Sequence, residues 1–133
     1  MITIRKLTSG EASAMLGAAV ADAAAASVPM SIVVVDASGT PLAVTRMDGA
    51  TPMTFEVGLS KARASAMSGI PTSAMASILK SMPELVSLPA FIGAGGGLPI
   101  LHDGHCIGGI GASGGSVEQD EQAAGAGLAT LAG

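Results

Sequence analysis

The chain has 133 residues, the length of one compact domain, and a formal net charge of −4. Hydrophobic residues make up 49% of it and charged residues only 12%. The basic residues are scattered and there is no Trp or Tyr, which argues against a nucleic-acid partner, since that needs clustered cations and stacking aromatics. Because ordinary domains carry about twice this fraction of charge, we expect a second copy of the chain to cover part of the surface.

The N-terminal region has a basic start and an apolar run, as a secretory signal does. Glu11 and Asp22 interrupt that run, however, and Thr8 with Glu11 forms a capping box that is typical of an ordinary helix. No apolar run reaches the roughly 20 residues that span a bilayer, so we expect no membrane partner. The single cysteine, Cys106, excludes an internal disulfide and fits a reducing compartment. We therefore expect a cytoplasmic protein.

The first half of the chain is predicted to form a helix, a strand hairpin and a second helix. Apolar residues recur at helical spacing over residues 8–27, and the helix should end before the proline that follows. The β-branched run 32–35 and the return run 42–47 indicate two strands joined by a turn. A second helix should begin at Thr51-Pro52, an N-cap followed by a first-turn proline, and end near residue 68, where Gly69 stops it.

The second half is predicted to form a shorter helix, a proline-punctuated loop, three strands and a last helix. Asp103-Gly104 is a strong signal for a two-residue hairpin turn. A capping box of Ser116 and Gln119 predicts the start of the last helix. The expected spans are helix 71–81, loop 82–90, a short strand near 90–94, strands 98–102 and 105–112, and a helix to about residue 131.

The strands therefore come in hairpin-linked groups and do not alternate with helices. That order favours an antiparallel sheet with helices packed on it, an α/β fold of the α+β type, over a parallel doubly wound sheet. No internal repeat or linker divides the sequence, so residues 1–133 are expected to form one domain.

Gly109, Gly111 and Gly114 spell G-x-G-x-x-G, the spacing of a dinucleotide-binding loop. That loop needs a strand after its helix and an acidic residue about 20 positions on, and the chain ends too soon for either. The helix start is also acidic, which repels phosphate. The glycines instead predict a strand that is bare on one side, where a ligand or another backbone can approach closely.

His102 and His105 flank the predicted hairpin turn and should face each other across it. Two imidazoles in this position could share a metal ion or present one ligand to haem iron, and the alternative is a pair of polar residues beside an exposed turn. Cys106 should point to the opposite face and act as a small hydrophobe.

Lys61 follows apolar residues on the second predicted helix, where it either reaches into a site and fixes an anion or extends to water. Ser113 is placed in the loop before the last helix, where its hydroxyl binds a ligand or caps a turn. Asp120 and Glu121 stand near the start of that helix, as acid–base candidates or as partners of the helix dipole.

Four segments resemble the GlcG/HbpS family, which is also found as the C-terminal domain of PduO-type proteins. They are "SIVVVDASGTPLAVTRMDGA", "SKARASAMSGIPT", "GGGLPI" and "IGGIGASGGSVEQDEQAAGAG", and their order and spacing cover nearly the whole chain. The resemblance implies a profilin-like three-layer sandwich with a five-stranded antiparallel sheet, assembled into homo-oligomers. Some members bind haem, with histidine as an axial ligand, and some accompany glycolate or propanediol metabolism genes.

By that similarity, the shared positions contain the ligand-binding candidates Arg46, Asp48, Lys61, Gly96, Gly97, Gly111, Ser113 and Gly114. The other shared positions are Gly49, Thr72, Pro99, Gly109, Gly115 and Asp120.

Three functions follow as hypotheses. The first is a small-molecule binding domain that holds haem or a small organic carboxylate in a pocket of an oligomer, between Lys61, Arg46 and the strand end at Ser113. The second is a cofactor-independent isomerase, lyase or hydrolase, in which Lys61 or Arg46 holds a carboxylate and Asp120 or Glu121 moves a proton. The third is a structural or assembly role, with the glycines serving close packing.

Overall fold

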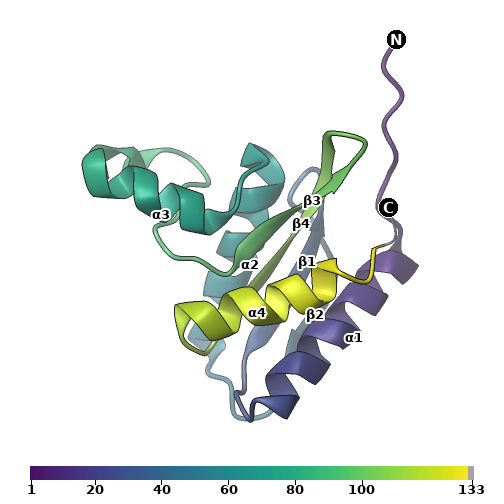
Figure 1. Cartoon of the computed structure of the whole chain (residues 1–133), viewed down its shortest axis with the longest axis vertical. Helices are drawn as coiled ribbons and strands as arrows, with labels where there is room; N and C mark the ends of the chain where they lie inside the picture. The colour runs from purple at the N-terminus through teal and green to yellow at the C-terminus, as the bar shows by residue number, and fades with distance from the viewer. Residues whose placement is uncertain (132–133) are drawn as a thin grey trace.

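The computed structural model describes residues 1–131 as a sheet between two helical layers (Figure 1). Helices α1 and α4 cover one face of the sheet, and α2 covers the other. None of the described helices combines the length and apolar character of a membrane-spanning segment. The elements are α1 Ser9–Ala25, β1 Ser31–Asp36, β2 Pro41–Arg46, α2 Pro52–Ser68, α3 Thr72–Ser81, the 3-10 helix η1 Pro83–Ser87, β3 Gly97–His102, β4 His105–Ser113 and α4 Val117–Leu128.

The sheet has four strands in the order β2-β1-β4-β3, and every neighbouring pair is antiparallel. The mixed fold and the antiparallel sheet are confirmed, but the expectation of five strands is wrong. Residues 90–94 form no strand. Ala90 has a positive φ of 55°, and the two apolar residues after it lead into the run Gly93–Gly97 of glycine and alanine, which provides no alternating side chains to pack.

The helix ends agree closely with the local signals in the sequence. Thr8 with Glu11 and Ser116 with Gln119 both form complete capping boxes, and Gly69 ends α2 in the left-handed conformation with φ 77°. Helix caps depend on only a few neighbouring residues, so they can be predicted from the sequence before any tertiary contact is known. Helix α4 ends at Leu128, before the expected residue 131.

Strand β1 lies in the middle of the molecule, and its two faces belong to different cores. Ile32 and Val34 pack in the cluster under α1 and α4, whereas Val33 and Val35 pack with Ala62 beneath α2. All four side chains are fully buried, which explains why this strand is a continuous β-branched run with no polar alternation.

The glycines of β4 allow α2 to lie directly on the sheet. A Cβ atom at Gly109 would overlap the carbonyl oxygen of Ala62, and one at Gly111 would overlap that of Gly58. The G-x-G spacing therefore places two bare positions on the face that meets α2. The sequence predicted that either a ligand or another backbone would approach this strand. At Gly109 and Gly111 it is the backbone of α2.

Gly111→Ala should lower the free energy of unfolding by about 1–3 kcal/mol or more, because its methyl group would meet helix backbone that cannot rotate away. Gly17→Ala on α1 is the matched control, since nothing lies within 4 Å of its Cβ position and alanine is the better helix former. Urea unfolding measures both. Equal stability of the two variants would contradict this account of the packing.

Candidate functional site

Three polar residues form a row across one end of the sheet. Ser31 on β1 pairs with Arg46 on β2 and with Ser113 on β4, so the three side chains point to the same face. The Ser31 hydroxyl is 2.8 Å from the Thr54 hydroxyl, which itself donates to the Thr51 carbonyl at 2.6 Å. The row therefore faces the first turn of α2. Because the Thr54 hydroxyl hydrogen is used in the bond to Thr51, the Ser31 hydroxyl is the hydrogen-bond donor to Thr54.

Ser113 is the last residue of β4, whereas the sequence placed it in the following loop. The register explains the difference, because Ser113 continues the ladder opposite Ser31. Its side chain is buried, with 8% of the residue exposed, and its hydroxyl has no hydrogen-bond partner within residues 1–131. The Ser113 hydroxyl still reaches solvent, because within residues 1–131 the only fully buried side-chain oxygen or nitrogen without a partner is Ser65 Oγ. It is therefore a donor that a ligand at the sheet end could use.

The electrostatics of this sheet end favour an anion. Arg46 is exposed and forms no ion pair within the part of the chain that the structure describes. Helix α2 starts beside the row, its N-cap residue Thr51 makes no side-chain cap, and no acidic residue stands in its first turn. The positive end of the helix dipole thus adds to the guanidinium charge. Asp48, in the turn after β2, is exposed.

Lys61 and Asp120 form a buried ion pair behind the row. The Lys61 ammonium donates to Asp120 Oδ2 at 3.0 Å and to the Ala112 carbonyl at 2.9 Å, and both charged side chains are at most 5% exposed. Asp120 Oδ1 accepts the amide proton of Gly115 at 2.9 Å. The structure thus brings two predicted site residues into contact, but it holds the Lys61 charge inside the protein. Glu121 lies apart from the pair, against Gly95.

The predicted glycines make room for this ion pair and its surroundings. A Cβ atom on Gly96, whose φ is +121°, would lie 2.9 Å from Lys61 Nζ, and one on Gly97 would lie 2.5 Å from the Lys61 carbonyl oxygen. The Gly97 amide donates to the buried Thr72 hydroxyl at 2.9 Å. Gly114, with φ +143°, turns the chain tightly against Pro29. The three glycines therefore let neighbouring backbone and side chains pack closely at this end of the sheet.

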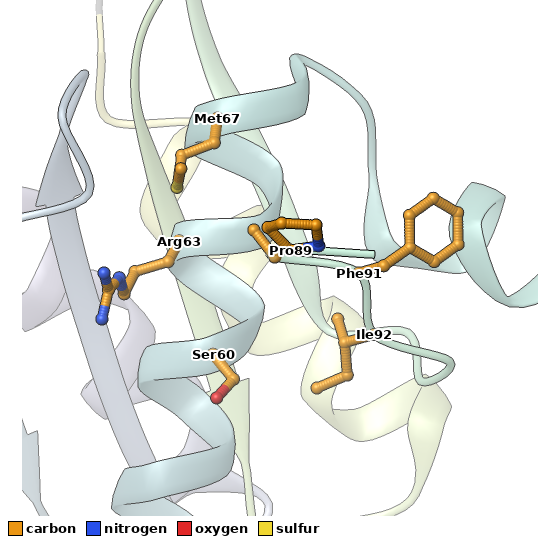
Figure 2. Close-up of a pocket in the computed structure, with 7 residues that line it drawn as sticks. Ser60, Arg63, Met67, Pro89, Phe91 and Ile92 are labelled. Atoms are coloured by element: carbon orange, nitrogen blue, oxygen red, sulfur yellow. The ribbon is translucent and has the colours of Figure 1, made fainter. Parts of the chain in front are cut away.

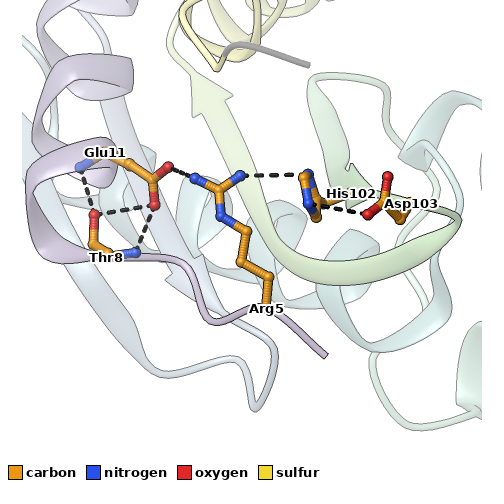
Figure 3. A network of polar contacts seen from close by, with 5 residues as sticks. All are labelled: Arg5, Thr8, Glu11, His102 and Asp103. Atoms are coloured by element: carbon orange, nitrogen blue, oxygen red, sulfur yellow. Dashed lines mark hydrogen bonds and ion pairs between the residues drawn. The ribbon is translucent and has the colours of Figure 1, made fainter. Parts of the chain in front are cut away.

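His102 and His105 pair across the β3–β4 hairpin at the opposite end of the sheet. His105 begins β4 and Ser113 ends it, which separates them by about 26 Å at a strand rise near 3.3 Å per residue. His102 lies between Arg5, 3.4 Å from its Nδ1, and Asp103, 3.3 Å from its Nε2 (Figure 3). Within residues 1–131, no group of three or more His, Cys, Asp or Glu side chains could hold a metal ion.

Cys106 is half-buried, and its thiol lies 3.3 Å from the carbonyl oxygens of Ala66 and Gly108. The sulfur thus contacts the backbone of α2 and does not join the histidines in a metal site. This matches the expected role as a small packing residue.

A cavity of about 450 Å³ lies between α2 and residues 89–92 (Figure 2). The Arg63 guanidinium is directed away from Pro89, and the Phe91 ring is turned away from α2. Lys61, Arg46 and Ser113 do not line this cavity, so it is separate from the sheet-end row. Its lining residues are Ser60, Arg63, Met67, Pro89, Ala90, Phe91 and Ile92.

The fold and these motifs define a family of small α/β/α domains. The sequence model of the family described as "Haem degrading protein HbpS-like" matches residues 7–129, and the chain belongs to this family.

Curated relatives include an uncharacterized 15.0 kDa protein of the dhaT-dhaS intergenic region of Citrobacter freundii. It is 33% identical over 122 residues, which cover 88% of this chain and 86% of that protein. The corrinoid adenosyltransferase PduO of Salmonella typhimurium is 33% identical over 119 residues, 86% of this chain, but the chain spans only 35% of PduO.

Solved structures agree with this fold over almost the entire chain. HbpS superimposes with a TM-score of 0.93 and 34% identity, covering 100% of this chain and 95% of that chain, and a double mutant of Streptomyces reticuli HbpS gives the same TM-score. The PduOC:heme complex superimposes with a TM-score of 0.88 and 30% identity, covering 96% of each chain.

Removing either partner of the Lys61–Asp120 pair should destabilise the fold by about 3–5 kcal/mol, because the remaining charge would stay buried without its counter-ion. Lys61→Met and Asp120→Asn test this by urea unfolding, with Lys80→Met at an exposed position of α3 as the control. Combining Lys61→Met with Asp120→Leu should recover part of the loss. Single variants as stable as the control would show that the pair is dispensable.

Proposed function

We propose that this domain binds a small molecule that presents a carboxylate to the sheet end, either haem or a small organic carboxylate. The observation that carries the proposal is that Arg46, which forms no ion pair within the described residues, lies in one row with the Ser113 hydroxyl at the start of α2.

The chemistry of the row suits a carboxylate in particular. A guanidinium donates two parallel hydrogen bonds that match the two oxygens of a carboxylate. The free Ser113 hydroxyl supplies a further donor, since Ser31 already donates to Thr54. Asp120 balances the charge of Lys61, so at the sheet end Arg46 would be the cation that a ligand meets. In this arrangement Lys61 is a positioning residue, because it holds the Ala112 carbonyl and the α4 carboxylate in place.

Haem is one candidate because the family description names haem degradation and a relative was solved as a haem complex. At the sheet end, Arg46 and Ser113 would hold the two propionate groups of haem. The iron does not find a histidine ligand there, because His102 and His105 lie about 26 Å away, farther than the width of a porphyrin. Bound haem would supply iron redox chemistry.

An oligomer could bring a histidine close to the sheet end, although the two lie far apart within one copy of the chain. The low charge of the chain already predicts that a second copy covers part of its surface. If the hairpin tip of that copy meets the sheet end, His102 or His105 of one protomer reaches a haem held by Arg46 of the other. The proposed pocket would then belong to the assembly, and both the oligomer and its pocket stay predictions. A cytoplasmic location stays a prediction.

A haem titration followed by absorbance tests this arrangement. We expect a Soret shift at micromolar haem, lost in His102→Ala or in His105→Ala, and binding at least about tenfold weaker in Arg46→Ala, since a hydrogen bond to a charged group contributes roughly 1.5–3 kcal/mol. Arg63→Ala, at an exposed position on α2, is the matched control. The absence of any shift at micromolar haem would remove haem as the ligand.

Small carboxylates test the same site independently of haem. Calorimetric titration with acetate, lactate and benzoate should show binding that weakens about tenfold in Arg46→Ala and several-fold in Ser113→Ala, as expected for lost charged hydrogen bonds. Ser60→Ala, an exposed serine of α2, should bind like the unmodified protein. If Arg46→Ala and Ser113→Ala both keep full affinity, the carboxylate site lies elsewhere.

A cofactor-independent isomerase, lyase or hydrolase is the second candidate. It is favoured by the direct contact of Lys61 with Asp120 beside the row, because acid–base catalysis needs ionisable groups close to the substrate. Glu121, which lies outside the pair, would be the group free to exchange a proton. Conversion of a bound carboxylate in the same titrations would favour this candidate. If neither haem nor any carboxylate binds, a structural or assembly role gains.

A further inference from the structure

We infer that the chain has a second, independent ligand site for an uncharged and mostly apolar small molecule, at the hairpin end of the sheet. A cavity of about 730 Å³ lies there between the N-terminal segment, residues 4–8, and the β1–β2 turn. Ligand sites for small organic molecules typically measure about 300–1,000 Å³. The lining residues are Ile4, Arg5, Lys6, Leu7, Thr8, Asp36, Ala37, Ser38, Leu42, Cys106 and Ile107.

The inner part of this N-terminal cavity is apolar. Leu7 and Ile107 are 7% and 2% exposed and belong to the core cluster under α1 and α4, and the half-buried Leu42 packs against the same cluster. Ile4 is 51% exposed and lies at the edge. A ligand that enters the cavity would therefore extend the hydrophobic core, and burial of its apolar surface would drive binding.

Of the three charged residues that line the cavity, Arg5 and Asp36 are paired or hydrogen-bonded within the protein, whereas Lys6 is exposed and forms no ion pair within the described residues. Arg5 pairs with Glu11 and contacts His102 (Figure 3). The Asp36 carboxylate accepts hydrogen bonds from the hydroxyl and amide of Ser38 and from the Thr40 amide. The Ser38 hydroxyl bond is the main reason that the pKa of Asp36 lies below its ordinary value.

These pairings decide the class of ligand. An anionic ligand would have to displace Glu11 from Arg5 or compete with Asp36 for Lys6, whose charge helps to lower the pKa of Asp36. A cationic ligand would compete with the donors around Asp36. An uncharged apolar molecule disturbs neither group and covers the exposed surface of Ile4. In the N-terminal cavity Arg5 is paired with Glu11, whereas at the sheet end Arg46 forms no ion pair within the described residues.

One wall of the cavity can adjust to an incoming molecule. Residues 1–6 are exposed and have no regular secondary structure, and the N-terminus extends away from the body of the protein (Figure 1). Leu7 is the first buried residue of the chain. Segments with few buried contacts open at low free-energy cost, so the stretch before Leu7 provides a route of entry.

The uncharged dye N-phenyl-1-naphthylamine tests the inference in the full chain. Its fluorescence should rise and shift to the blue on binding at micromolar concentration. Leu42→Glu should weaken binding at least about tenfold, because it places a carboxylate against the apolar wall. Val44→Glu, an exposed position of the same strand that does not line the cavity, is the matched control.

A second variant keeps the test decisive if Leu42→Glu fails to fold. Ala37 is exposed in the β1–β2 turn, and Ala37→Trp should fill the cavity mouth and reduce dye binding while the fold stays intact. Arg46→Ala should leave dye binding unchanged. No dye binding, or equal binding by both cavity variants and the control, would overturn the inference. So would displacement of the dye by haem or acetate, since the site would then not be reserved for uncharged ligands.

Discussion

The close approach of α2 to β4 is the constraint on which the rest of the structure depends. Gly109 and Gly111 remove the side chains that would keep helix and strand apart, so the helix backbone rests on the strand backbone. At that distance the Lys61 main chain lies against Gly97, and its side chain extends past the glycines to the end of the sheet. The glycines of β4 therefore determine where the Lys61 side chain lies, at the end of the sheet.

The Lys61–Asp120 ion pair connects three elements of the fold. Because it neutralises the Lys61 charge, it also leaves Lys61 unavailable to pair with a ligand. Lys61 on α2 is bonded to a β4 carbonyl and to Asp120 on α4, and Asp120 also holds the loop that leads into α4. Burial of two charges is tolerable because each has its partner and further hydrogen bonds. The consequence for function is a separation of roles. Lys61 is held inside the protein, whereas Arg46 on β2 is exposed and forms no ion pair within the described residues.

Much of the fold could be predicted from the sequence because its signals are local. The capping boxes at Thr8 and Ser116 and the left-handed turn at Gly69 each act over a few residues. The row of Ser31, Arg46 and Ser113 is different, because it depends on strand register. Likewise, 59 positions separate Lys61 from Asp120, and no local pattern reveals that they neutralise each other. The expected fifth strand near residues 90–94 is absent because only its first residues are apolar. The glycine and alanine residues that follow provide no side chains to pack in a strand.

The two ends of the sheet have opposite chemistry, and this difference constrains how a haem-sized ligand can be used. One end has an exposed guanidinium, a helix start and the Ser113 hydroxyl, which are donors of the kind that suit a carboxylate. The other offers an apolar cavity, internally paired charges and the histidines. Because the length of β4 separates them, no single planar ligand spans both within one protomer. A ligand that needs a carboxylate contact and a histidine together would therefore have to lie between two copies of the chain, which is the arrangement we propose for haem.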